Sequence, residues 1–269
     1  MNKLILSSLT LTGFFSINTL QQANAASNNQ YNTDGKINYL PSANSTKPVD
    51  PTNPDPTQPI TPQNPDGSNA TPGTKGPLSI DFASSLDFGS QAIVATNRSY
   101  NALAQKYTTN SGTSTSGPNF VQITDNRGSF SGWKLSVKQD TQFKSAKKNI
   151  SLDGANLTFN SGIHVSQNTS DEGITATNSF TLNPGEEVTL MTGSPANDSG
   201  INGTGGTHIL RFGNNTSDLL VDEKNGDGSD RGVTTSAIKL NVPGKAPKVA
   251  DNYTTNLNWI LSDTPSNTN

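Results

Sequence analysis

Short segments in which apolar and polar residues alternate run through the chain from Leu78 onward, and they constrain its fold more than any other feature. Trp133, Leu135 and Val137 form one such series, separated by polar residues. A period of two is that of a β-strand, whose successive side chains point to opposite faces. The segments expected to form strands are LSIDFA, SLDFG, NFVQITD, GWKLSVKQ, ANLTFN, GIHVSQ, NSFTL, EEVTLMT, THILRFG, AIKLNVP and LNWILSD.

Turn-forming residues, mainly Gly, Asn, Asp and Ser, lie between these segments. No long stretch shows the 3.6-residue period of a helix, and the single weak helical candidate is SYNALAQKY at residues 99–107. This pattern predicts an all-β fold, namely a Greek-key-like β-sandwich formed by residues 78–269.

The N-terminus has the pattern of a secretory signal peptide over residues 1–25. Lys3 precedes a mostly apolar stretch over residues 4–20, and a small-any-small triplet at residues 23–25 matches a cleavage site. Ser and Thr interrupt the apolar stretch, which disfavours a membrane-spanning helix of about 20 apolar residues. We therefore expect an exported chain that begins at Ala26.

The sequence contains no Cys, so neither a disulfide nor a thiol-linked lipid can form. The last residues, DTPSNTN, carry no hydrophobic tail, basic stop or LPxTG-type sorting signal. We expect the exported protein either to be released or to be held by non-covalent binding. Its stability must come from an ordinary hydrophobic core, for which about 240 residues are ample.

Residues 26–77 have the composition of a disordered arm. Proline recurs at short intervals between Pro41 and Pro77, and only Val49 and Ile60 are clearly apolar there. Such a segment buries too little surface to offset its chain entropy, and its prolines favour extended polyproline II. We expect a semi-rigid spacer that displays the β domain, with a simple linker as the alternative.

Both Trp residues of the chain lie in the same tripeptide, Trp-any-Leu. The first tripeptide is Trp133–Leu135 and the second is Trp259–Leu261. In a strand, residues two positions apart share a face, so each tripeptide presents an aromatic ring beside an aliphatic side chain. These faces are expected either to fill the core or to stack on the apolar face of a sugar.

Together, these features resemble the WxL-domain surface proteins of low-GC Gram-positive bacteria, over essentially all of residues 78–269. The segment GPLSIDFASSLDFG resembles the family's opening strand pair, and VQITDNRGSFSGWKLSVKQ carries the proximal motif. The distal motif has the form YxxxLxWxLxxxP and is the most specific; it comprises Tyr253, Leu257, Trp259, Leu261 and Pro265. The chain departs from larger members in having only the Pro-rich arm where they carry adhesin modules.

The resemblance implies a secreted protein of the cell wall or cell surface, attached non-covalently through a C-terminal WxL domain with peptidoglycan or an associated wall polymer as the ligand. In the alternative interpretation, the chain is the protein-interaction subunit of a surface complex. It then docks on a membrane-anchored WxL-interacting protein and works with other WxL proteins. Neither interpretation requires a cofactor, and nucleic acid is not an expected partner.

The residues expected to bind the ligand lie in and around the two motifs; they are Trp133, Lys134, Leu135, Lys138, Lys144, Tyr253, Trp259 and Leu261. The face that ends in Trp259 and Leu261 is more apolar than one sugar subsite requires. We therefore expect the second motif to be mainly structural or to face a protein partner. The first motif is the better candidate for contact with the wall, because it lies beside a basic strand face.

Basic side chains gather between residues 127 and 148, where only Asp140 opposes them, although the whole chain has a net charge of −3. They are Arg127, Lys134, Lys138, Lys144, Lys147 and Lys148. Lys134 and Lys138 share the polar face of one strand and could attract phosphate or carboxylate groups of wall polymers. The alternative is a solvated strand face that discourages edge-to-edge aggregation.

The segment DEKNGDGSDRG, residues 222–232, partly follows the ligand spacing of a calcium loop. Thr234 stands where such a loop needs its bidentate Glu, so a polar hairpin loop is the preferred interpretation and no metal site is expected.

Two carboxylate pairs, Asp171-Glu172 and Glu186-Glu187, could in principle serve a wall glycosidase. Adjacent carboxylates on a strand point to opposite faces, and no Ser-His-Asp or metal-ligand pattern surrounds His164 or His208. We therefore expect no catalytic residues and no enzyme.

Overall fold

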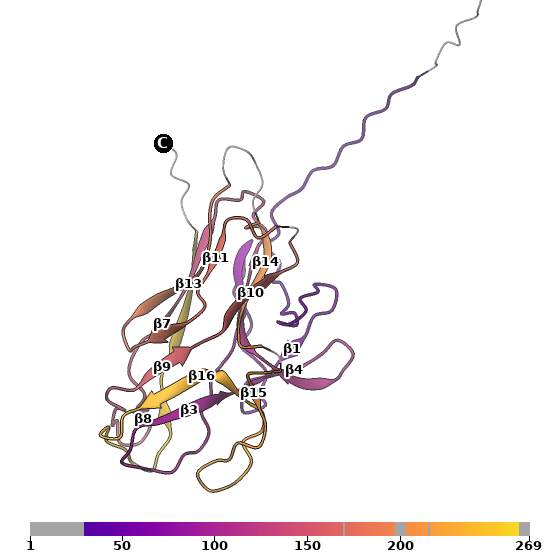
Figure 1. Ribbon diagram of the computed structural model, residues 1–269. Coiled ribbons are helices and arrows are strands. Elements are labelled where there is room, and N and C mark those ends of the chain that lie inside the picture. The colour runs from indigo at the N-terminus through magenta and orange to yellow at the C-terminus, as the bar shows by residue number, and fades with distance from the viewer. Residues whose placement is uncertain (1–29, 169, 197–202, 215, 264–269) are drawn as a thin grey trace, which may run out of the picture. The chain divides into compact units, whose positions relative to one another are not determined.

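A computed structural model describes residues 30–168, 170–196, 203–214 and 216–263 (Figure 1). These residues form β-strands and no helix, which confirms the all-β prediction. In this part of the chain there is accordingly no helix long and apolar enough to cross a membrane. The predicted signal peptide, residues 1–25, lies outside the described residues.

Two four-stranded antiparallel sheets hold the sequence motifs. The strand order of the first is β10 (Gly162–Ser166), β14 (Gly206–Phe212), β6 (Asn119–Asp125) and β2 (Leu78–Ala83). The order of the second is β11 (Ile174–Ala176), β13 (Glu187–Gly193), β7 (Trp133–Gln139) and β18 (Leu257–Asp263). The outer strands of the two sheets contact each other, β10 with β11 and β2 with β18. The two sheets therefore lie against each other.

The remaining strands form three further sheets. The largest has the order β12 (Phe180–Leu182), β9 (Asn156–Phe159), β16 (Thr234–Val242) and β15 (Leu219–Leu220), with β3 (Arg98–Leu103) also paired to β16. A second contains β1 (Thr61–Pro62), β4 (Gln105–Thr108) and β5 (Ser114–Gly117), and a third contains β17 (Tyr253–Thr254) and β8 (Lys144–Ser145).

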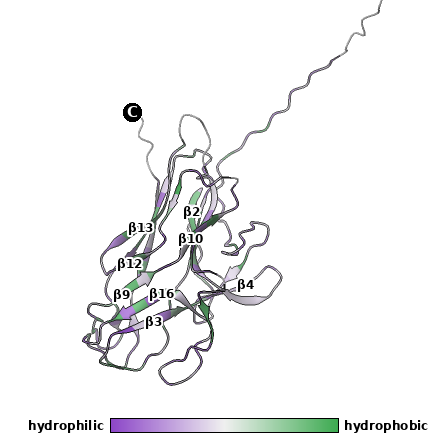
Figure 2. Cartoon of the chain, in the orientation of Figure 1, coloured by the Kyte–Doolittle hydropathy of each residue, from purple (hydrophilic) through white to green (hydrophobic). Residues whose placement is uncertain are grey.

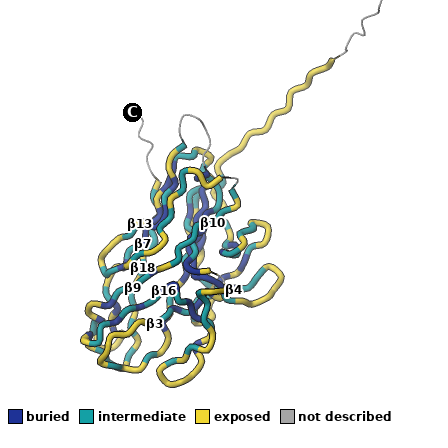
Figure 3. The backbone as a smooth tube through the Cα atoms, in the orientation of Figure 1, coloured by how far each residue is buried: buried dark blue, intermediate teal, exposed yellow. Residues whose placement is uncertain are grey.

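The main hydrophobic core is shared by the three largest sheets. Ile123 on β6, Leu135 on β7, Leu157 on β9 and Ile238 on β16 are fully buried in it. Buried residues follow the strands of these sheets, and hydrophobic residues alternate with polar ones along the same strands (Figures 2 and 3). Burial of each such aliphatic side chain stabilises the fold by about 2 kcal/mol.

The alternation in the sequence located most of these strands. Every predicted segment except SLDFG overlaps a strand, including those that became β6, β7, β14, β16 and β18. The weak helical prediction for residues 99–107 is wrong, because this segment forms β3 and β4. Ala102 and Tyr107 are buried there, so packing against neighbouring strands overrides a marginal helix propensity.

The Pro-rich segment is not disordered where it carries apolar residues, which corrects that part of the spacer prediction. Val49 and Ile60 are 2% and 5% exposed, in a second core cluster with Phe82, Tyr107, Phe120 and Ile209. The two apolar side chains that the sequence places among the prolines therefore anchor this segment.

A polar contact fastens the same segment to β6. The side chain of Gln122 accepts a hydrogen bond from the amide of Val49 (2.9 Å) and donates to the carbonyl of Lys47 (3.1 Å). It also donates to the buried carboxylate of Asp81 on β2 (2.8 Å). By contrast, residues 30–38 are exposed and contain no strand or helix.

Candidate functional site

The two Trp-any-Leu tripeptides lie on neighbouring antiparallel strands. In the register of β7 and β18, Leu135 is opposite Leu261, and Val137 is opposite Trp259. Residues opposite each other in an antiparallel pair share a face of the sheet. The Trp and Leu side chains of both motifs therefore point to the same side, which is the side of the main core.

Trp133 is fully enclosed on an inner strand of its sheet. Its indole Nε1 donates a hydrogen bond to the carbonyl oxygen of Thr204 (2.9 Å), and its ring lies 5.1 Å from that of His208. Gly193 is opposite it on β13, where a Cβ atom would lie 2.8 Å from Cε2 of the indole. Leu135 is equally buried. This burial corrects the expectation that the first motif contacts the wall, because both of its side chains are core residues.

The second motif is only partly buried, because β18 is the outer strand of its sheet. Leu257, Trp259 and Leu261 pack against the core from this position. Leu257 and Trp259 also line a groove between β18 and β2, with a volume of about 810 Å³. Trp259 is therefore the Trp that borders a surface depression.

The groove combines an aromatic and aliphatic lining with polar groups. Its apolar lining includes Ile80, Phe82, Leu86, Phe88, Phe143, Tyr253, Leu257 and Trp259. Its polar lining includes Thr74, Asp140, Thr254, Thr255, Asn256 and Asn258. Aromatic rings beside amide, hydroxyl and carboxylate groups can stack on a sugar ring while bonding its hydroxyls, or can receive apolar side chains of a protein.

Backbone contacts hold the aromatic end of the groove in place. Tyr253 lies on β17 opposite Ser145, and its hydroxyl accepts a hydrogen bond from the amide of Val249 (2.9 Å). The hydroxyl of Thr255 donates to the carbonyl of Thr141 (2.5 Å). These bonds fix the chain that leads into β18, so Tyr253 has a defined position.

Two of the three predicted lysines, Lys134 and Lys138, lie on the other face of the same sheet, and the third lies on a separate two-stranded sheet. Lys134 is opposite Ser262 and Lys138 is opposite Asn258, so both side chains point away from the core. Lys144 lies on β8, opposite Thr254. Among the described residues, none of these three lysines forms an ion pair. Alternation along β7 thus separates Lys134 and Lys138 from the Trp face, whereas Lys144 is opposite Thr254, which lines the groove.

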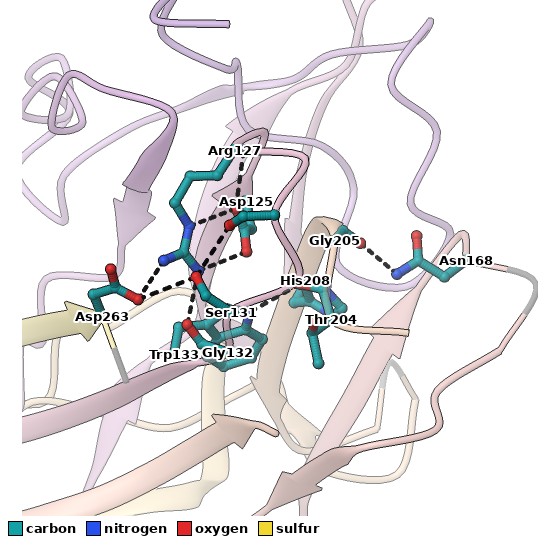
Figure 4. A network of polar contacts seen from close by, with 11 residues as sticks. Asp125, Arg127, Ser131, Gly132, Trp133, Asn168, Thr204, Gly205, His208 and Asp263 are labelled. Atoms are coloured by element: carbon teal, nitrogen blue, oxygen red, sulfur yellow. Dashed lines mark hydrogen bonds and ion pairs between the residues drawn. The ribbon is translucent and has the colours of Figure 1, made fainter. Parts of the chain in front are cut away.

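Arg127 does not belong to the free basic surface. Its guanidinium pairs with Asp125 (2.8 Å) and with Asp263 at the end of β18, and donates to the carbonyl of Gly132 (2.7 Å) (Figure 4). Hydrogen bonding to Asp125 raises the pKa of Arg127. The residue therefore joins the end of β6 to the end of β18, next to the enclosed Trp133.

The segment 222–232 forms a hairpin in which Glu223, Asp227 and Asp230 are engaged within the protein. Lys224 is bridged to Asp230 across the hairpin, and Asp227 accepts hydrogen bonds from the amide and hydroxyl of Ser229. Glu223 pairs with Arg231 (3.0 Å). The preferred interpretation of this segment as a hairpin loop agrees with the structure.

The two carboxylate pairs are far apart in the topology. Glu186 and Glu187 lie at the start of β13, where Ser136 donates to Glu187 (2.6 Å). Asp171 accepts from Ser166 (2.7 Å), and its carboxylate lies 3.8 Å from His164. The structure therefore brings one member of a pair to a histidine, a contact that the sequence did not indicate.

The fold and these surfaces define an all-β domain, with an aromatic groove at one sheet edge and a basic face beside it. A family model described as WxL domain surface cell wall-binding matches residues 26–265. The chain belongs to this family, which confirms the resemblance, and its place is the cell wall or cell surface. The match also includes the Pro-rich segment that the sequence pattern had set apart.

Searches of curated proteins and of solved structures found no significant match. The family description names wall binding and no enzymatic activity.

Sequence reasoning missed the β2 wall of the groove and the Thr204–His208 contacts of Trp133. Both depend on strand pairing over long separations, as between β2 and β6 or β14 and β6. The one local signal was the glycine-rich stretch GTGGT at residues 203–207, which brings backbone close to Trp133.

Proposed function

We propose that this chain attaches non-covalently to peptidoglycan through its C-terminal WxL motif, with the groove between β2 and β18 as the contact surface. The observation that carries this proposal is that Trp259 and Tyr253 border the groove while Trp133 is enclosed. Glycan strands present apolar ring faces and many hydroxyl groups. The aromatic rings and the polar lining of the groove match both features.

The lysines support the same proposal by long-range attraction. Lys134, Lys138 and Lys144 are without ion-pair partners in the described structure. The first two lie on the sheet that ends at the groove, and Lys144 lies on β8, opposite the groove residue Thr254. Stem-peptide carboxylates or wall phosphates bound at the groove would pass close to this edge. The lysines therefore add salt-dependent affinity and faster association rather than a specific contact.

A second candidate is docking on a membrane-anchored WxL-interacting protein, and the edge of β18 favours it. The amide of Asp140 donates to the carbonyl of Asn256 (3.1 Å), just before β18 begins. Backbone hydrogen bonds to β7 therefore recur at every second residue from Asn256 onward. By this alternation, Leu257, Trp259 and Leu261 direct their backbone groups away from β7. A protein partner could add a strand to this edge and fill the groove with its side chains.

We infer further that the two four-stranded sheets act as the layers of a Greek-key-like β-sandwich. The contacts of β10 with β11 and of β2 with β18 support this description, as does the packing of Trp133 on His208 between the layers. The third large sheet then closes one end of the core. Residues 30–38 are exposed and form no strand or helix, so they act as the spacer. The Pro-rich residues around Val49 and Ile60 do not, because they are anchored in a core cluster.

Co-sedimentation with purified sacculi tests the function. The sacculi are stripped of protein, and the chain from Ala26 is added with or without a candidate partner protein. Sedimentation of the chain alone supports peptidoglycan binding, whereas sedimentation only with the partner supports docking. Zymography on the same sacculi addresses catalysis, and a cleared zone would contradict a purely binding role.

Matched variants on β18 test the groove. Trp259→Ala removes the groove aromatic, and Ile260→Ala alters the opposite face of the same strand. We expect Trp259→Ala to lower sacculus binding at least tenfold, and Ile260→Ala to bind like the parent. Thermal unfolding of both variants verifies that they are folded. Equal binding by the two variants would remove the groove from the mechanism.

A further inference from the structure

The two histidines of the chain form a stacked pair beside Trp133. His164 on β10 and His208 on β14 lie with their rings 23° from parallel, and Nε2 of His164 is 3.1 Å from Nδ1 of His208. His208 is fully buried and packs on the Trp133 ring (Figure 4), while 11% of the His164 side chain is exposed. The pair thus connects the surface to the enclosed Trp.

The hydrogen-bond partners determine where the ring protons lie in the neutral pair. Nε2 of His208 is 3.2 Å from the carbonyl oxygen of Thr204, which can only accept, so Nε2 carries the proton. Nδ1 of a neutral His208 is then an acceptor. His164 must donate to it from Nε2, which leaves Nδ1 of His164 unprotonated.

A first added proton fits this arrangement. It binds Nδ1 of His164, which lies 3.8 Å from the carboxylate of Asp171 and close to solvent. The charged ring still donates from Nε2 to His208, so the chain of hydrogen bonds from His164 through His208 to Thr204 stays intact.

A second proton does not fit. Its only site is Nδ1 of His208, where it would face the N–H of His164 across 3.1 Å. The hydrogen bond between the rings would be replaced by two donors and two positive charges in contact. Repulsion then drives β10 from β14 at this point, where Ser166 is opposite His208.

Charged groups on the neighbouring elements do not compensate this repulsion. Asp125 on β6 is already paired with Arg127. Arg211 on β14 is three residues from His208 and points to the other face of the sheet. Asp81 on β2 bonds Thr124, which is also on that other face because Ile123 is the residue opposite His208. Asp125 shares the face of His208 but is neutralised by Arg127, so Asp171 is, among the described residues, the acid whose carboxylate contacts the pair.

We propose that His164 and His208 form an acid-sensitive lock on the junction that encloses Trp133. The lock holds while at most one of the two rings is protonated. It opens when both are protonated, because the hydrogen bond between the two rings is lost. As the strands then separate, His208 and Trp133 no longer both donate to the carbonyl oxygen of Thr204.

The direction of the pH effect follows from the burial of His208. Burial, and then the neighbouring His164, lower the pKa of His208 to about 4, and burial also lowers the pKa of His164. The folded state therefore binds fewer protons than the unfolded state, whose His pKa is about 6.5. The stability from the neutral rings is complete above pH 6.5 and is lost as the pH falls toward 4. Burial raises the pKa of Asp81, so its protonation stabilises the folded state as the pH falls. Asp81 therefore cannot cause the loss of stability in acid.

Nuclear magnetic resonance of the imidazole nitrogens tests the lock in the chain from Ala26, without any wall ligand. With two histidines, His164→Gln and His208→Gln assign every signal. We expect both neutral rings to carry the proton on Nε2, and His164 to titrate before His208. Titration of His208 first, or a neutral His208 protonated on Nδ1, would overturn the proposal.

The indole N–H signal of Trp133 reports whether the junction opens, and Trp259→Phe identifies that signal. We expect it to shift between pH 6 and 3.5 together with the His208 titration, and to stay unchanged over this range in His208→Gln. A Trp133 signal that is constant while His208 titrates would overturn the lock. So would the same shift in His208→Gln, because acid would then act elsewhere. Neither result depends on whether the protein binds peptidoglycan.

Discussion

The strands β7 and β18 carry the same tripeptide and are paired to each other, yet they expose it differently. On β7, which has a neighbour on both sides, Trp133 and Leu135 are fully buried. On β18, which has one neighbour, Trp259 and Leu261 are half-buried and Trp259 borders the groove. The difference shows that position in the sheet, rather than the motif itself, decides which Trp borders the surface.

The comparison predicts its largest effect at the inner strand. Trp133→Ala removes a fully buried indole and its hydrogen bond to the carbonyl of Thr204. It should therefore lower the free energy of unfolding by about 3–5 kcal/mol. Urea denaturation followed by circular dichroism measures this loss. A loss below about 1 kcal/mol would mean that Trp133 is not the core residue described above.

The edge strand predicts a smaller effect of the same change. Trp259→Ala removes a half-buried ring, so the free energy of unfolding should fall by about 2 kcal/mol, roughly half the loss at a buried site. The same urea series measures it. If both Trp variants lose equal stability, the contrast between the two strands disappears.

Arg127, which joins the end of β6 to the end of β18, predicts a still smaller effect on stability. Arg127→Gln removes the guanidinium that pairs with both Asp125 and Asp263. The free energy of unfolding should fall by only about 1–2 kcal/mol, because Asp263 is largely exposed. Hydrogen exchange should then rise at the end of β18 and not at β9. Uniform exchange across both strands would contradict a local tie.

The unpaired lysines of β7 and β8 predict the smallest effect on stability. The triple variant Lys134→Glu, Lys138→Glu and Lys144→Glu should change the free energy of unfolding by about 0.5 kcal/mol or less per site, because none of these lysines is ion-paired. Binding to sacculi should weaken and lose most of its salt dependence. Binding that is unchanged between low and high salt would exclude the lysines.

Much of the fold could be predicted from local alternation. For Trp133, the continued apolar face of Leu135 and Val137 favoured burial, but the neighbouring lysines led to the expectation of wall contact. The Pro-rich segment shows why composition alone is insufficient. Its average polarity indicated disorder, but the two apolar residues Val49 and Ile60 suffice to dock it on Phe82 and Phe120.

The site was less predictable, because its parts meet through pairing that no local pattern records. The register that places Trp259 opposite Val137 joins segments over a hundred residues apart. His164 and His208 are 44 residues apart, and no local pattern connects them. Lys134 and Lys138 were assigned to the correct strand face, but the sequence could not show that Trp259 and the groove lie on the opposite one.

Acrylamide quenching of single-Trp variants tests most directly whether the two motifs have different roles. Trp133→Phe leaves Trp259 as the only fluorophore, and Trp259→Phe leaves Trp133. On addition of soluble peptidoglycan fragments, we predict that Trp259 becomes at least twofold less accessible to acrylamide, while Trp133 stays inaccessible throughout. Protection of Trp133 on binding, or bound fragments that leave Trp259 equally accessible, would contradict the division of roles between the enclosed and the groove-lining Trp.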